Sequence, residues 1–189
     1  AIELTIFDDG QLEVVERATG LRWTPDPWEQ AAGELTVSRG GGQETFNLSR
    51  SPEIRRTALP DGARFSYGIA GGVVEVIIAL HQTEPEIAVR VERLDVAGWR
   101  ELVFPSRAFA LRSFVDHGAG VLPLWNGFIV PSWKFECGAG EFMRRDDQMW
   151  SDSARKIHPV WAWGGLRMPW FGVTRDVAGK RSGWLAILD

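Results

Sequence analysis

The chain has 189 residues, of which 44% are hydrophobic and 24% are charged, and its formal net charge is −4. This length and composition are typical of one globular domain with its own core, and they exclude a disordered chain. The negative charge, and the absence of any Lys/Arg run longer than a pair, argue against a nucleic-acid partner. No stretch reaches the roughly 18 apolar residues of a membrane span, so we expect no membrane partner.

Cysteine and histidine usage points away from metal and cofactor chemistry. Cys137 is the only cysteine, so an internal disulfide is excluded, but the compartment stays unassigned. No two of the three histidines, His81, His117 and His158, are spaced as metal ligands. No phosphate-binding loop, dinucleotide fingerprint or Gly-x-Ser-x-Gly motif is present. We therefore predict no metal and no cofactor.

The first forty residues predict a hairpin and further short strands. Alternating residues flank Asp8-Asp9-Gly10, and an Asp-Gly turn between alternating runs is a strong hairpin signal. A turn at 18–20 leads into a strand at 21–23, and the two prolines in 24–33 predict a loop. The strand that contains Leu35 and Val37 should end at the three glycines 40–42.

Residues 53–94 predict four more strands joined by tight turns. The strands are 54–59, 63–69, 73–80 and 86–94, separated by Pro-Asp-Gly, Gly-Gly and Thr-Glu-Pro. The third is apolar on both faces, as in a central strand, and its β-branched residues favour a strand over a helix. The fourth nearly alternates, so one face should be buried and the other wet. We interpret Arg55, Arg56, Arg90 and Glu92 as parts of a solvated sheet face.

The fold class follows from this spacing. No segment has the 3.6-residue period and the caps of a long helix, whereas short strands follow one another at turns. We predict an all-β, two-layer antiparallel β-sandwich that forms a single domain over residues 1–189. The expected strands at both ends suggest that this domain is cut from a longer, multi-domain chain.

Tryptophan is concentrated late in the chain, among Gly, Pro, Asp, Arg and His. Seven of the ten tryptophans follow position 124: Trp125, Trp133, Trp150, Trp161, Trp163, Trp170 and Trp184. Such a cluster either fills a core or offers aromatic faces to a flat apolar partner. The loop acids nearby, Asp116, Asp146, Asp147 and Asp152, are the candidates for the two carboxylates that a glycosidase needs. The spacing pairs no two of them, and we predict no catalytic residue in this chain.

Three segments resemble a known family. Residues 116–131 (DHGAGVLPLWNGFIVP), 168–173 (MPWFGV) and 183–188 (GWLAIL) are similar to the N-terminal region of large glycoside hydrolases related to the endo-α-N-acetylgalactosaminidases. In that family a galactose-mutarotase-like supersandwich precedes a catalytic (β/α)8 barrel. The resemblance implies a non-catalytic domain that packs on the barrel of the same chain, which holds the nucleophile and the acid/base.

The resemblance also implies a carbohydrate partner. A loop with Asp116, His117, Trp125 and Asn126 is expected to bind substrate, with a ring face stacking on Trp125 and polar groups binding hydroxyls. Two alternatives stay open. The chain is a free-standing carbohydrate-binding module or lectin, or it is a structural spacer whose tryptophans only fill the core and a domain interface.

Overall fold

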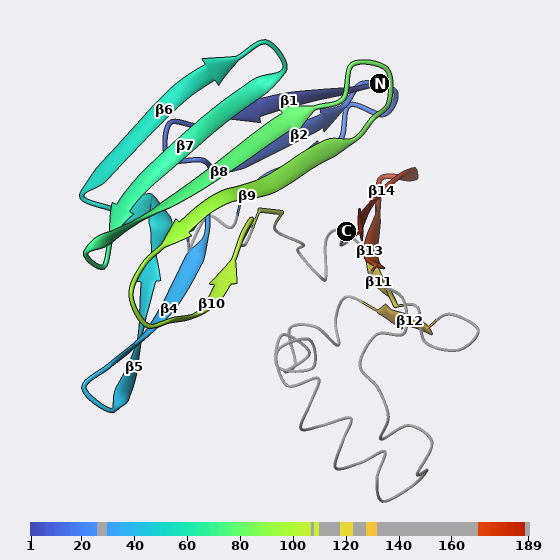
Figure 1. The fold of residues 1–189 in the computed structure, drawn as a ribbon. Helices are drawn as coiled ribbons and strands as arrows, with labels where there is room; N and C mark the ends of the chain where they lie inside the picture. The colour runs from blue at the N-terminus through green and yellow to red at the C-terminus, as the bar shows by residue number, and fades with distance from the viewer. Residues whose placement is uncertain (26–29, 107, 110–117, 123–127, 132–169, 188–189) are drawn as a thin grey trace, which may run out of the picture. The chain divides into compact units, whose positions relative to one another are not determined.

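The computed structural model describes residues 1–25, 30–106, 108–109, 118–122, 128–131 and 170–187 (Figure 1). Contacts divide the chain into two compact units, Ala1–Ala110 and Leu111–Asp189. The expectation that residues 1–189 form one domain stays a prediction.

The first unit is an antiparallel β-sandwich. One layer is a four-stranded sheet in the order β6-β7-β8-β9, and the other layer consists of two three-stranded sheets, β1-β2-β3 and β10-β4-β5 (Figure 1). A single turn of 3₁₀ helix, Leu48–Arg50, follows β5. The strands are β1 (Ile2–Ile6), β2 (Leu12–Glu16), β3 (Arg22–Trp23), β4 (Glu34–Arg39), β5 (Gly42–Asn47), β6 (Glu53–Leu59), β7 (Gly62–Ile69), β8 (Gly72–Leu80), β9 (Ile87–Asp95) and β10 (Trp99–Val103).

The core lies between these layers because alternate residues of each strand point inward. Phe65 opposes Val76 and Tyr67 opposes Val74 in the β7–β8 register, so all four share the inner face. The Phe65 and Tyr67 rings stack with centroids 5.9 Å apart. The facing layer contributes buried residues of β2 and β4. The buried cluster comprises Leu12, Leu35, Val37, Leu48, Ala63, Phe65, Tyr67, Ile69, Val74, Val76, Ile78 and Val96.

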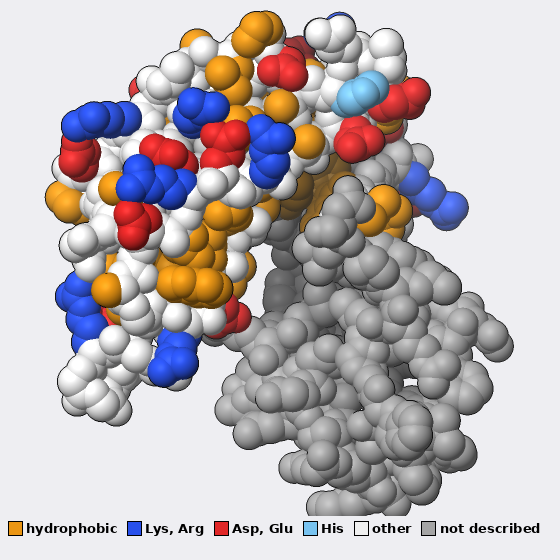
Figure 2. Space-filling view, in the orientation of Figure 1, with side chains coloured by type: hydrophobic (Ala, Val, Ile, Leu, Met, Phe, Trp, Pro, Cys, Tyr) orange, Lys and Arg blue, Asp and Glu red, His pale blue; other side chains and the backbone are white. Residues whose placement is uncertain are grey.

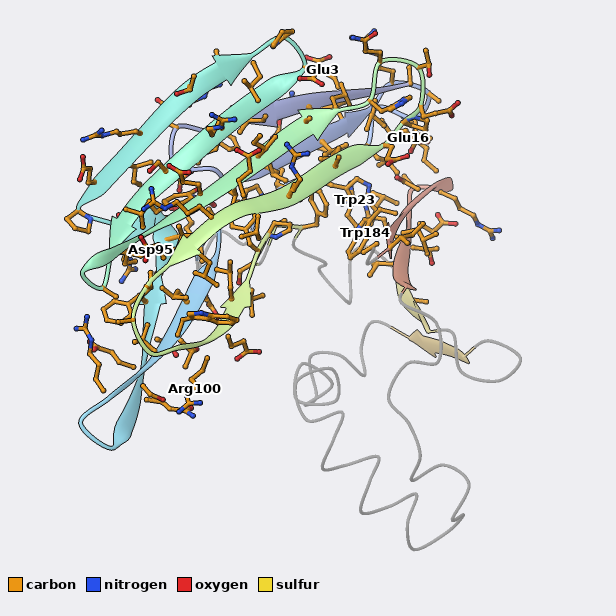
Figure 3. The ribbon with its side chains drawn as sticks, viewed as in Figure 1. Glu3, Glu16, Trp23, Asp95, Arg100 and Trp184 are labelled. Carbon is orange, nitrogen blue, oxygen red and sulfur yellow. The ribbon has the colours of Figure 1, made fainter. Side chains whose placement is uncertain are left out.

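The outer face of the β6–β9 sheet carries paired charges (Figure 2). Glu92 lies 3.0 Å from Arg64 and 2.8 Å from Arg90, and Arg93 lies 2.8 Å from Asp95 (labelled in Figure 3). This confirms the interpretation of Arg90 and Glu92 as part of a solvated face, and Arg55, paired with Glu53, belongs there as well. Exposed ion pairs of this kind contribute little to the stability of a fold, so their main effect is to keep this face of the sheet hydrated.

Arg56 is exposed as well, but it lies on the opposite face of the sheet from these residues. It opposes Phe65 in the β6–β7 register, which puts it on the inner side of an edge strand. Its guanidinium nitrogen lies 2.9 Å from the Asp8 carboxylate in the β1–β2 turn. The side chain therefore links the two layers at the rim of the sandwich.

Two strands of the first unit were not predicted. The polar strand β5 pairs with β4 from Glu34↔Asn47 to Arg39↔Gly42, so Gly42 begins a strand rather than ending one. Only Gly40 and Gly41 form the turn, with φ of 56° and 84°. Strand β10 pairs with the other edge of β4, through a bulge between Trp99 and Glu101, and the Arg100 Nε donates to the Ser38 Oγ at 2.8 Å (Figure 3).

Strand β9 is less buried than its alternation predicted. The β8–β9 register shifts at Glu75/Val76, which places an extra residue in β9. Val91 opposes Val76 but is 46% exposed because β9 is an edge strand of the described sheet. Its inner face is therefore only partly buried, at Ile87, Val89 and Leu94.

The second unit contains one described four-stranded antiparallel sheet in the order β12-β11-β13-β14. Strands β13 and β14 form a hairpin from Trp170↔Ile187 to Val177↔Lys180, turned by Ala178 and Gly179 at φ of 53° and 78°. On β14, Leu185 and Ile187 are 56% and 65% exposed. The strands are β11 (Ala119–Leu122), β12 (Phe128–Pro131), β13 (Trp170–Val177) and β14 (Lys180–Ile187).

Candidate functional site

The four predicted sugar-binding residues, Asp116, His117, Trp125 and Asn126, lie outside the described residues, so their role stays a prediction. The structure describes strand β11, which lies between the two pairs in the chain, and strand β12, which follows them. Strand β11 pairs with β12 from Ala119↔Pro131 to Leu122↔Phe128. In chain order, Asp116 and His117 precede the Ala119 end of β11, whereas Trp125 and Asn126 belong to the connection that follows its Leu122 end.

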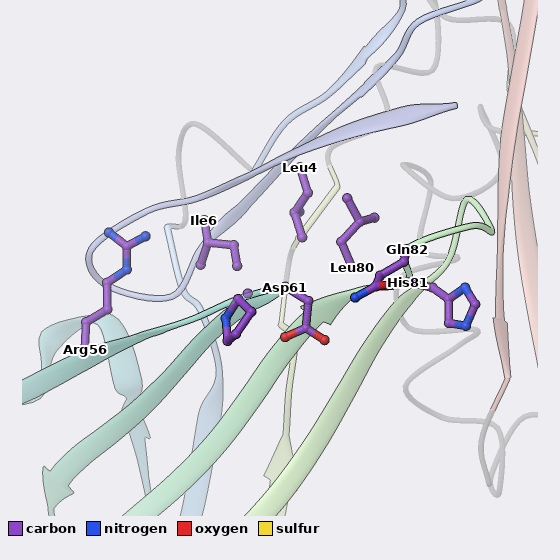
Figure 4. A pocket seen from close by; sticks show the side chains of 9 residues that line it. Leu4, Ile6, Arg56, Asp61, Leu80, His81 and Gln82 are labelled. Atoms are coloured by element: carbon purple, nitrogen blue, oxygen red, sulfur yellow. The ribbon is translucent and has the colours of Figure 1, made fainter.

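A hollow lies at the rim of the first unit and is the candidate site among the described residues (Figure 4). It has a volume of about 430 Å³, within the range of small-molecule sites. Strand β1, the β6–β7 turn and the end of β8 surround it. The lining residues are Leu4, Ile6, Arg56, Pro60, Asp61, Gly62, Leu80, His81 and Gln82.

The floor of this rim hollow is aliphatic and its edge is polar. Leu4 and Ile6 are partly buried against the sandwich core, and they line the hollow together with Leu80 at the end of β8. Figure 4 shows Arg56 at one end of the hollow and Gln82 at the other, with Asp61 between them. Polar atoms make up more of the exposed lining than apolar atoms, so the hollow is more polar than most small-molecule sites.

Backbone contacts hold the walls of the rim hollow in place. The Leu80 N–H donates to the Asp61 carbonyl oxygen at 2.8 Å, which pins the β6–β7 turn to β8. Gly62 lies so close to β8 that a Cβ there would be 1.9 Å from the Ile78 carbonyl oxygen. Across the hollow, the Arg56–Asp8 ion pair joins β6 to the β1–β2 turn. These contacts set the positions of the segments that surround the hollow.

The His81 ring accepts hydrogen bonds from the backbone of the turn that follows it. Its Nδ1 accepts from the Glu84 N–H at 3.1 Å and from the Thr83 N–H at 3.4 Å, so a neutral ring carries its proton on Nε2. In Figure 4 the ring points away from Leu4 and Ile6. His81 thus shapes the wall, and its side chain is not aimed into the hollow.

Unlike those of His81 and Arg56, the side chains of Asp61 and Gln82 make no hydrogen bond or ion pair with the described residues. Within that part of the chain, Asp61 takes part in backbone hydrogen bonds only, and the Gln82 amide makes no hydrogen bond at all. A carboxylate accepts hydrogen bonds, and a primary amide both donates and accepts them. The edge of the rim hollow therefore presents free acceptors and donors above an aliphatic floor.

Sequence reasoning identified none of these lining residues as a site. It located the Pro60-Asp61-Gly62 turn and the end of the strand at Leu80, but not their meeting with β1. A tertiary contact between segments that lie far apart in the chain leaves no local periodicity to read. An Asp in a tight turn is by itself a common turn residue rather than a functional signal.

The described part of the chain shows neither a metal cluster nor a membrane helix. There, no three His, Cys, Asp or Glu side chains gather as a metal site would require. Within the same residues, no helix combines the length and the apolar character that crossing a membrane takes. Of the described tryptophans, Trp23 is buried against the ring of Phe109, whereas Trp99 is about half exposed.

Comparisons with known proteins do not extend these observations. No model of a protein family matches the chain, and the search of curated proteins returns no match either.

Proposed function

We propose that this chain is a non-catalytic β-sandwich domain of a multi-domain glycoside hydrolase, of the galactose-mutarotase-like supersandwich type. In this proposal it packs on a (β/α)8 barrel of the same polypeptide, and a loop with Asp116, His117, Trp125 and Asn126 reaches the substrate cleft. The nucleophile and the acid/base belong to the barrel. The role of the chain is to position a glycan.

The observation that carries the proposal is the pairing of β13 with β14. The described parts of two segments on which the family resemblance rests, 170–173 and 183–187, pair there as neighbouring strands, with Gly172 opposite Leu185. The antiparallel sandwich of the first unit is compatible with the proposed type. Leu185 and Ile187 add support, because large exposed apolar side chains on one strand suit a surface that another domain covers.

The test is turnover by a polypeptide that contains this chain together with a barrel. We expect Trp125→Ala and His117→Ala to lower kcat/KM by about tenfold or more, which corresponds to roughly 1.4 kcal/mol of lost transition-state binding. Trp99→Ala is the matched control, since Trp99 is an exposed tryptophan of the first unit. Unchanged turnover in both loop variants would identify a spacer, and glycan binding by the chain without any barrel in its polypeptide would identify a free-standing module.

A further inference from the structure

The rim hollow is a second candidate binding site, separate from the loop in the proposed function. Its two charged groups both come from the β6–β7 hairpin: the Arg56 guanidinium lies at one end and the Asp61 carboxylate further along (Figure 4). Arg56 is also paired with Asp8 at 2.9 Å, so its charge is largely balanced before any ligand arrives. The charge that stays unbalanced is that of the Asp61 carboxylate, so the hollow disfavours an anion.

Charge and polarity together narrow the ligand class. An anion would lie beside the unbalanced Asp61 carboxylate and be repelled by it. A cation would gain only the attraction of one open carboxylate, which contributes little in water. A purely apolar ligand would bury Asp61 and Gln82 without hydrogen bonds, which is costly. A neutral ligand with one apolar face and several hydroxyl groups satisfies both the aliphatic floor and the polar edge.

We propose that the rim hollow binds one neutral sugar ring. Its C–H face rests on Leu4 and Ile6, one hydroxyl donates to the Asp61 carboxylate, and another exchanges hydrogen bonds with the Gln82 amide. The choice of a sugar among neutral polyols rests on the proposed function, whereas the site itself is separate from residues 116–126. The hollow is open and its ligand small, so we expect a Kd on the order of 1 mM.

The experiment is an NMR titration of the ¹⁵N-labelled chain with sugars of matched size. The neutral probes are D-galactose, D-glucose and N-acetyl-D-galactosamine, and the charged probes are D-glucuronate and D-glucosamine. We expect at least one neutral probe to shift the backbone amides of Asp61, Gly62 and Gln82 in a saturable manner. D-Glucuronate should bind at least tenfold more weakly, whereas the ammonium group of D-glucosamine should change the Kd by less than about tenfold.

Variants of the two free side chains test the assignment of the contacts. Asp61→Ala and Gln82→Ala should each weaken the binding tenfold or more. The matched controls are Asp95→Ala on the outer sheet face and Gln43→Ala on β5, which remove the same side chains at exposed positions away from the hollow. Unchanged amide shifts in β7 and β8 show that each variant keeps the sandwich intact.

Several results would overturn this proposal without touching the proposed function. These are the absence of any shift at Asp61, Gly62 and Gln82, tighter binding of D-glucuronate, tenfold tighter binding of D-glucosamine, or binding that both alanine variants retain. Sugar binding that only Trp125→Ala abolishes would likewise leave the proposed function standing and remove this site. Conversely, saturable shifts at the hollow, with turnover insensitive to Trp125→Ala and His117→Ala, would keep this site and remove the proposed role of the loop.

Discussion

The Tyr67 hydroxyl donates to the carbonyl oxygen of Asp9 at 3.0 Å, which ties the middle of β7 to the β1–β2 turn across the sandwich. The ring is fully buried, and the hydrogen bond satisfies the one polar atom that this burial removes from water. The contact leaves no room at the neighbouring residue. A Cβ on Gly10 would lie 2.0 Å from the Tyr67 oxygen, and Gly10 has φ of 91°.

Gly10→Ala is therefore expected to destabilise the sandwich unit by about 2 kcal/mol or more, from the collision with Tyr67 and from the left-handed backbone. Tyr67→Phe alone should cost about 1 to 2 kcal/mol, because it leaves the Asp9 carbonyl without its buried donor. Urea unfolding of the two single variants and of the double variant measures how strongly the effects of the two substitutions on the free energy of unfolding depend on each other. When Tyr67→Phe is already present, Gly10→Ala should cost about 1 kcal/mol less, since the colliding oxygen is gone. Strictly additive costs would contradict this account.

Burial raises the pKa of the Tyr67 hydroxyl well above its ordinary value, and the nearby Asp9 charge raises it further. The unfolded chain releases this proton near pH 10, whereas the folded chain keeps it. The contribution of Tyr67 to stability is thus complete below about pH 10 and is lost as the pH rises beyond it. Tyr67 is the only tyrosine, so tyrosinate absorbance reports on it alone.

We expect no tyrosinate absorbance as long as the protein stays folded. At the alkaline pH where the protein unfolds, the tyrosinate signal and the loss of structure should appear together. Tyr67→Phe is the control, and the free energy of unfolding of this variant should fall less steeply above about pH 10 than that of the parent. A tyrosinate signal near pH 10 in protein that remains folded would show that the hydroxyl is accessible to water.

Gly62 is predicted to tolerate no side chain, because a Cβ would lie 1.9 Å from the Ile78 carbonyl oxygen and 2.8 Å from the Ala79 Cα. Both atoms belong to the backbone of β8, which cannot yield without breaking the β7–β8 ladder. Gly62→Ala should cost more than about 2 kcal/mol in urea unfolding. Gly42→Ala is the matched control at the start of β5, where the nearest atom is 3.7 Å away, and it should change stability by less than about 1 kcal/mol. Equal costs for the two would refute the close approach of the β6–β7 turn to β8.

Val37 and Val103 offer a matched test of the core, since they lie in neighbouring strands of one sheet and are 0% and 40% exposed. Val37→Ala removes two buried methyl groups and leaves a cavity, so we expect a cost of about 2 kcal/mol. Val103→Ala should cost about 0.5 kcal/mol, which reflects strand propensity more than packing. The urea midpoints of the two variants are the measurement. A larger loss of stability for Val103→Ala than for Val37→Ala would contradict the burial of Val37 in the core.

Local chemistry was enough to predict much of the first unit. The turns at Asp9-Gly10 and Asp61-Gly62, and the alternating or β-branched runs of β1, β7 and β8, are recognisable within a few residues. Neither of the missed strands alternates: β5 has one large apolar residue, Phe46, and in β10 the apolar residues Trp99 and Leu102 are three positions apart. They are strands because β4 supplies a hydrogen-bonding edge on each side, which a single-segment pattern cannot reveal.

By itself, then, the sequence determined an all-β antiparallel sandwich, because side-chain alternation and turn residues act over distances of about two to four positions. Only the tertiary structure decided that Arg56 reaches Asp8 at the rim of the sandwich, and that Val91 is exposed on an edge strand of the described sheet. It also decided that Leu4, Asp61 and Gln82 surround one hollow. The physical reason is that these contacts depend on which strands pair and how the layers stack, and those choices are made by the whole set of packed residues at once.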